Sequence, residues 1–198
     1  MTNPIGIAIN FASALTVACD EKMPPQQPTS RIKTHREIMS TNEPTFEIAE
    51  VYTSLRTQVL QLKPSELGLS DVDQSTVFAV LMETAYPEAV ATLVAIMDGT
   101  ASIYFSNGGG IIGGGEHENV RSVCADFIAM AQQLVPQSTL SKTFPLPLKD
   151  HVRFYLVTAD GVYTLEALAD DLGYERHPGS PLFFLGHELI SAIREHST

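Results

Sequence analysis

The chain has 198 residues, of which 44% are hydrophobic and 18% are charged, a balance typical of globular rather than disordered proteins. Its net charge of −11 repels nucleic-acid phosphates and anionic membranes, so we expect neither as a partner. No apolar run approaches the roughly 18 to 20 residues that span a bilayer. Two cysteines, Cys19 and Cys124, are too few for a disulfide framework, and we expect a reducing, cytoplasmic setting.

Residues 1–38 differ from the rest of the chain. They hold four basic and three acidic residues, whereas the remainder holds 8 basic and 20 acidic. They also contain a Pro-Pro-Gln-Gln-Pro spacer of low complexity. Three interpretations stay open: a disordered leader, an export signal suggested by Leu15-Thr-Val-Ala-Cys19, and a natural start at Met39. We expect residues 39–198 to form a single α+β domain.

An amphipathic helix is predicted to begin at about Thr45. Apolar residues recur there every three or four positions, the spacing of one helical face. These residues are Ile48, Val51, Tyr52, Leu55, Val59 and Leu62. Pro64 follows and predicts the helix end, with a loop over residues 64–74.

Five strands are predicted, over residues 76–86, 91–97, 100–106, 152–159 and 162–167. The first is a continuous apolar run, typical of a central strand covered on both faces. Asp98-Gly99 and Asp160-Gly161 each fit the type I′ turn of a hairpin. Two such hairpins predict a largely antiparallel sheet.

Two further helices are predicted. The first lies between the hairpins, with Val120, Val123, Cys124, Phe127, Ile128, Ala131 and Leu134 on one face. Residues 170–179 are predicted as a polar loop. Ser180 and Pro181 are predicted as the cap and first turn of the last helix. Its inward residues are Leu182, Leu185, Leu189, Ile190 and Ile193.

This order of elements predicts an α+β fold, a two-layer sandwich in which helices pack on a largely antiparallel five-stranded sheet. The layout loosely resembles profilin-like folds such as the roadblock family. Roadblock domains place two strands before the central helix and three after it, whereas this chain has three and then two. The resemblance concerns the order of elements alone and implies no function.

The run from Gly108 to Gly115 reads Gly-Gly-Gly-Ile-Ile-Gly-Gly-Gly and leads into a helix. Such a loop can hold a phosphate with backbone N–H groups, but the Walker and dinucleotide-binding patterns are both missing. Glu116 and Glu118 would repel an anion at this helix start. We therefore expect glycines that serve positive φ angles or close backbone approach, with Ile111 and Ile112 pinning the loop to the core.

The histidines do not form a metal motif. A zincin needs His-Glu-x-x-His, and the histidine that follows His187 is His196, on the opposite side of a helix. The sequence predicts no cofactor, no metal site and no catalytic residue. Cys124 lies on the apolar face of its helix and is predicted to be a buried, unreactive thiol.

Two functions are compatible with these features. The favoured hypothesis is a non-enzymatic cytoplasmic interaction or regulatory domain that binds another protein, with a basic partner suited to its acidic surface. A homo-oligomer is also compatible with the sequence. The alternative is an enzyme or a small-molecule binder with a pocket beside the glycine run. The candidate residues of that pocket are Gly113, Gly114, Gly115, Glu116, His117 and Glu118.

Overall fold

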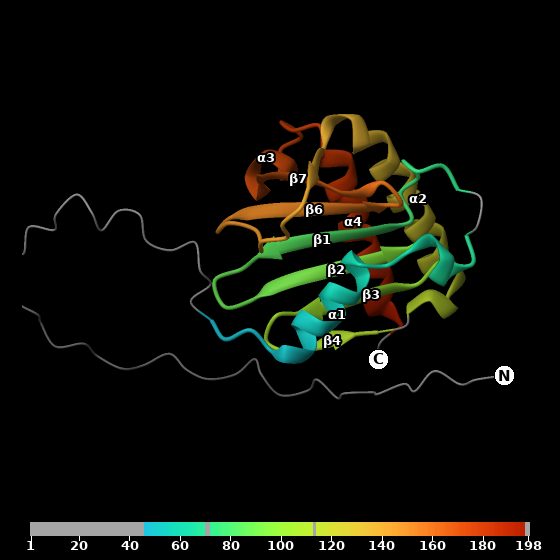
Figure 1. The fold of residues 1–198 in the computed structure, drawn as a ribbon. Helices are drawn as coiled ribbons and strands as arrows, with labels where there is room; N and C mark the ends of the chain where they lie inside the picture. Colours follow the sequence, from blue (N-terminus) through green and yellow to red (C-terminus); the bar gives the residue numbers. More distant parts are fainter. Residues whose placement is uncertain (1–45, 70–71, 113, 197–198) are drawn as a thin grey trace, which may run out of the picture. The chain divides into compact units, whose positions relative to one another are not determined.

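The computed structural model describes residues 46–69, 72–112 and 114–196 (Figure 1). The leader predicted over residues 1–38 lies outside these residues. The described residues build an α+β fold around one open antiparallel sheet of seven strands. Among the described residues, no helix is long and apolar enough to cross a membrane.

Every pair of neighbouring strands is antiparallel, and the order across the sheet is β4-β3-β2-β1-β6-β7-β5. The strands are β1 Ala79–Ala85, β2 Val90–Ile96, β3 Ala101–Phe105, β4 Gly110–Ile111, β5 Thr139–Ser141, β6 His151–Thr158 and β7 Gly161–Leu168. The continuous apolar run of the sequence is β1, at the centre of the sheet. The central position predicted for this strand is confirmed.

Helices cover both faces of the sheet, with α1 on one face and α2 and α4 on the other (Figure 1). The α-helices are α1 Glu50–Leu60, α2 Glu118–Leu134, α3 Ala169–Gly173 and α4 Ser180–Glu195. Three short 3-10 turns accompany them: η1 Pro64–Leu67, η2 Gly114–Glu116 and η3 Val135–Gln137.

Two apolar clusters fill the spaces between the sheet and these helices. Along β1, Val80 and Met82 belong to the cluster under α2 and α4, whereas Ala79 and Leu81 belong to the cluster under α1. This alternation follows from the period of two along a strand. A two-layer sandwich is therefore not confirmed, because apolar side chains project from both faces of the sheet and helices pack on each face.

The predicted count of five strands and the profilin-like layout are not confirmed either. The two additional strands, β4 and β5, have 2 and 3 residues and form the edges of the sheet. Such short segments carry no periodic signal. β4 comes from the glycine run, where Gly110 pairs with Tyr104 and Ile111 with Ile103.

The hairpin turns differ from the predicted type I′. That turn needs positive φ at both central residues, and Asp98 does not have it. Instead four residues, Met97 to Thr100, connect β2 to β3, with Gly99 at φ 88° and its N–H donating to the Ile96 carbonyl at 2.9 Å. In the second hairpin the two linking residues are Ala159 and Asp160, neither with positive φ.

Several local predictions are also wrong. Val51 is 53% exposed, because α1 turns Tyr52, Val59 and Leu60 toward the sheet instead. Part of the loop predicted over residues 170–179 is helix α3, and η1 interrupts the loop predicted over residues 64–74. Ser180 is the first residue of α4 and does not cap it, because Gly179 occupies the N-cap position.

Candidate functional site

A pocket of about 450 Å³ opens between α2 and the end of the β2–β3 hairpin. We call it the α2 groove. It is lined by Thr76, Val77, Ile96, Met97, Asp98, Gly99, Arg121, Cys124, Ala125, Ile128, Ala129 and Gln132. Three separate segments therefore meet at it: the approach to β1, the hairpin, and about three successive turns of α2.

The shape of the α2 groove follows from small side chains on α2. Ala125 and Ala129 are exposed and lie four residues apart, so they share one face of the helix. Their single methyl groups leave space between α2 and the hairpin. Ile128 is buried, and Met97 on the hairpin is 39% exposed. The groove is therefore a largely apolar surface that stays open to the outside.

The amide of Gln132 at one end of the groove is already bonded. Its Oε1 accepts the Val77 N–H at 2.8 Å, and its Nε2 donates to the Ser75 carbonyl at 3.2 Å. These bonds tie the C-terminal half of α2 to the chain that leads into β1. Gln132 thus shapes this end of the groove.

Cys124 lies beneath the groove and is fully buried, as predicted. Its Sγ donates weakly to the carbonyls of Ile96 at 3.5 Å and Thr100 at 3.8 Å. Burial raises the pKa of the Cys124 thiol to about 11. At neutral pH the sulfur therefore keeps its proton and is a poor nucleophile.

Two opposite charges lie at the hairpin end of the groove. Arg121 comes from α2, and its Nη1 donates to the carbonyls of Gly115 and Glu116, each at 3.0 Å. Asp98 comes from the hairpin, and its Oδ1 accepts the Thr100 N–H at 2.8 Å. Within the described part of the chain, the ion pairs are Arg56–Glu83, Arg153–Glu166 and Arg176–Asp171, so Arg121 and Asp98 do not pair with each other.

Of the six residues predicted for a pocket, the five that the structure describes do not line the α2 groove. Gly113 is outside the described residues. Gly114, Gly115 and Glu116 form η2, His117 is the N-cap of α2 and Glu118 is its first residue. The predicted site and the groove are thus neighbours, joined by Arg121.

The glycine run has the structural role expected of it where it is described. A Cβ added to Gly110 would lie 2.5 Å from the Ile103 carbonyl oxygen, and one added to Gly115 would lie 2.5 Å from the Gly99 carbonyl oxygen. Close backbone approach therefore requires both glycines. Ile112, however, is 65% exposed and does not pin the loop; Ile111 packs against the core instead.

His117 and His196 come together at the two helix ends. Their rings stack with centroids 3.6 Å apart and planes 6° apart, and His196 Nε2 bonds Asn119 Oδ1 at 2.9 Å. The contact joins the start of α2 to the end of α4. Sequence spacing gave no signal for it, because the two histidines are far apart in the chain.

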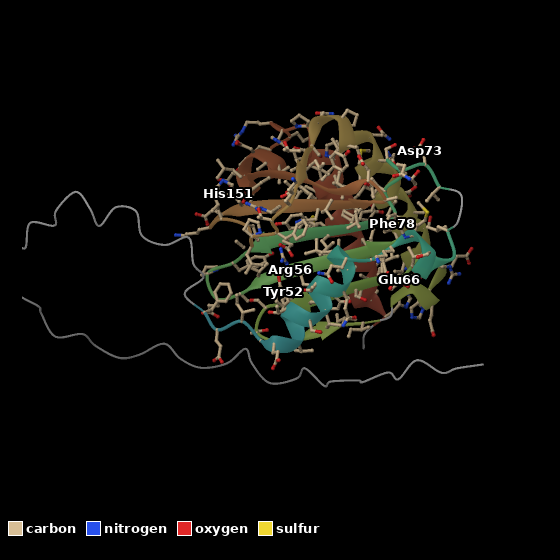
Figure 2. All side chains as sticks on the ribbon, viewed as in Figure 1. Tyr52, Arg56, Glu66, Asp73, Phe78 and His151 are labelled. Atoms are coloured by element: carbon tan, nitrogen blue, oxygen red, sulfur yellow. The ribbon has the colours of Figure 1, made fainter. Side chains whose placement is uncertain are left out.

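A second polar cluster lies under α1, where Figure 2 labels Tyr52 and Arg56 over the sheet. Glu83 on β1 is fully buried, and Arg56 holds both of its oxygens, with Nε at 2.6 Å and Nη2 at 3.0 Å. Thr92 Oγ1 donates to Glu83 at 3.4 Å and bonds the Tyr52 hydroxyl at 2.9 Å. Burial raises the pKa of the Glu83 carboxyl, and the Arg56 guanidinium opposes that shift.

The same cluster continues toward β7. Arg153 pairs with Glu166, whose other oxygen accepts the Leu148 N–H at 3.0 Å. The Tyr155 hydroxyl donates to the Pro145 carbonyl at 2.5 Å, and Arg56 lies 5.4 Å from the Tyr155 ring centre. These bonds hold α1 and the chain around Pro145 onto the sheet, and the buried Arg153 Nε is left without a hydrogen-bond partner. The arrangement is that of a structural network.

No group of three histidine, cysteine, aspartate or glutamate side chains is placed to hold a metal ion in the part of the chain that is described. No protein-family model matches this chain, and comparisons with curated proteins and with solved structures find no match. The α2 groove is therefore the feature of the described residues that suits a ligand best.

Proposed function

We propose that this protein is a non-enzymatic binding domain that holds a small, largely apolar ligand in the α2 groove. The observation that carries the proposal is the groove itself: about 450 Å³ lined mostly by apolar side chains. Small-molecule pockets of roughly 300 to 1,000 Å³ usually combine an apolar lining with a few polar groups. The groove has this composition.

The side chains around the groove favour binding over covalent chemistry. Cys124, the cysteine at the groove, is buried, and burial raises the pKa of its thiol to about 11. The amide of Gln132 is occupied by backbone partners. Glu83, a fully buried carboxylate, is paired with Arg56 under α1, on the other face of the sheet.

A ligand in the α2 groove corresponds to the small-molecule alternative predicted from the sequence, at a site other than the glycine run. The hypothesis of a protein partner stays a prediction, as does the suggestion that a basic partner would suit the acidic chain. The cytoplasmic setting also stays a prediction. A groove of this kind would let a small ligand regulate such an interaction domain.

Binding can be tested with N-phenyl-1-naphthylamine, a neutral apolar dye that fluoresces when it leaves water. We expect saturable binding to the wild type and at least a tenfold loss in Ala125→Trp, whose indole would fill the groove. Ser122→Trp is the matched control, because Ser122 is exposed on the same helix and does not line the groove. Equal binding by all three proteins would overturn the proposal.

A further inference from the structure

The two charged groups of the α2 groove lie at its hairpin end. Arg121 and Asp98 both line the groove there, on α2 and on the hairpin respectively. At the other end, Gln132 is bonded to Ser75 and Val77. The Cys124 thiol is directed to backbone carbonyls beneath the groove. A ligand would therefore find its charged partners at one end and apolar walls along the rest.

Both charged side chains are held in place by the backbone. One guanidinium nitrogen of Arg121 donates to the Gly115 and Glu116 carbonyls, and the aliphatic part of its side chain lies against Gly99. The other N–H groups of the guanidinium form a planar fork suited to a carboxylate. Asp98 uses Oδ1 for the Thr100 N–H, which leaves Oδ2 to accept from a ligand.

A ligand with a single charge would match only one of these groups. An anion would meet Arg121 and also be repelled by Asp98 and by the net charge of −11. A cation would meet Asp98 and be repelled by Arg121. A zwitterion avoids both penalties, since each of its charges faces its opposite and its net charge is zero.

We infer that the α2 groove binds an apolar α-amino acid, an inference that rests on the proposed function. The carboxylate would bind Arg121, the ammonium would bind Asp98, and the side chain would lie between Met97, Ala125 and Ile128. A volume of about 450 Å³ accommodates large side chains such as those of leucine, phenylalanine and tryptophan. The two charges would fix the orientation, and the apolar walls would select for size.

The test is displacement of N-phenyl-1-naphthylamine at pH 7 by L-phenylalanine and two derivatives. N-acetyl-L-phenylalanine lacks the ammonium, and L-phenylalaninamide lacks the carboxylate. Each derivative should displace the dye about tenfold less well or worse, the effect of losing one charge-assisted hydrogen bond. L-Leucine should compete as L-phenylalanine does, and L-serine should not.

Variants assign each charge to its residue. Asp98→Asn keeps the oxygen that accepts from Thr100 and should abolish the preference for L-phenylalanine over the N-acetyl derivative. Arg121→Gln should abolish the preference over the amide, and Arg121→Lys should retain part of it. Lys149→Gln is the control for Arg121→Gln, because it removes the same charge. Lys149 lies two residues before His151, and Figure 2 labels His151 at the end of the sheet opposite Phe78, which follows the groove residue Val77.

The outcomes separate this inference from the proposed function. If the dye binds in the groove and no amino acid displaces it, the ligand class is wrong and the groove remains a binding site. Displacement by both derivatives as strongly as by L-phenylalanine would also overturn the ligand class. If the dye does not bind at all, both the proposed function and this inference fall.

Discussion

At the scale of single residues, the buried pair of Glu83 and Arg56 has the largest predicted effect on stability. A buried carboxylate that loses its bonded cation keeps a charge that no bonded partner compensates, which costs about 3 to 5 kcal/mol. We therefore expect Arg56→Ala and Glu83→Ala each to destabilise the fold by that amount in urea unfolding. Replacing both by leucine should cost less than the sum of the two single changes.

The exposed pair of Arg176 and Asp171 is the matched control. Its closest nitrogen and oxygen are 2.9 Å apart, similar to the buried pair, but the side chains are 58% and 39% exposed. Breaking it by Asp171→Ala should cost no more than about 1 kcal/mol. Equal losses for the two pairs would show that Glu83 is not buried as described.

Cys124 predicts a specific dependence of stability on pH. Its folded pKa of about 11 lies above the ordinary value of 9.0, so the folded state favours the protonated thiol. The associated stability is fully present below pH 9 and is lost as the pH rises through 11. Between these values, the wild type should lose more stability than Cys124→Ala in parallel denaturant titrations.

The loss at high pH should be accompanied by slow labelling of Cys124 at neutral pH, with Cys19 replaced by serine to leave one thiol. Cys124→Ala itself should cost about 1 kcal/mol, since it removes a small buried group. Rapid modification of the folded protein by a thiol reagent at pH 7 would contradict the buried, protonated thiol.

Two glycine-to-alanine substitutions are expected to change the free energy of unfolding in different directions. Gly110→Ala brings a methyl group against the Ile103 carbonyl and should destabilise by about 1 to 3 kcal/mol. Gly173 has no atom within 4 Å of an added Cβ, so Gly173→Ala should be neutral or stabilise by up to about 1 kcal/mol. Thermal unfolding of the two variants beside the wild type measures the difference. A neutral Gly110→Ala would mean that β4 does not pair with β3.

At the scale of elements, α1 shows where helical periodicity reaches its limit. Val51 and Val59 both fit the apolar spacing, yet Val51 is 53% exposed and Val59 is 8% exposed. Val59→Ala should cost about 2 kcal/mol through lost burial. Val51→Ala should be neutral or slightly stabilising, because alanine has the higher helix propensity. Equal costs in urea unfolding would place α1 in a different rotation on the sheet.

The elements that the sequence predicted correctly are those with many periodic residues. α2 has a seven-residue apolar face, and of these Val120, Cys124, Phe127, Ile128, Ala131 and Leu134 are buried. β1 was evident from its unbroken apolar run. In contrast, β4 and β5 depend on tertiary pairing with β3 and β7, and the short helix α3 begins in a polar segment. Local propensity carries little information on such elements.

At the scale of the whole molecule, the candidate site could not be read from the sequence. The α2 groove is assembled from the approach to β1, the β2–β3 hairpin and one face of α2. Its main signal in the sequence, Ala125 and Ala129 four residues apart on α2, also fits an ordinary solvent-facing surface. The glycine run suggested a site because glycine-rich loops before helices can bind phosphate. In its described part, the glycines allow close approach of the backbone instead.

The methionine methyl groups give the most direct test of whether the α2 groove is a ligand site. With ¹³C-methyl methionine in the protein, addition of N-phenyl-1-naphthylamine should shift the Met97 signal, because Met97 lines the groove and is 39% exposed. The Met82 signal should stay in place, because Met82 is 1% exposed in the core and does not line the groove. Met97→Leu assigns the signal. A saturable shift of Met97 alone is the predicted result, and binding of the dye with an unmoved Met97 signal would show that the dye binds outside the α2 groove.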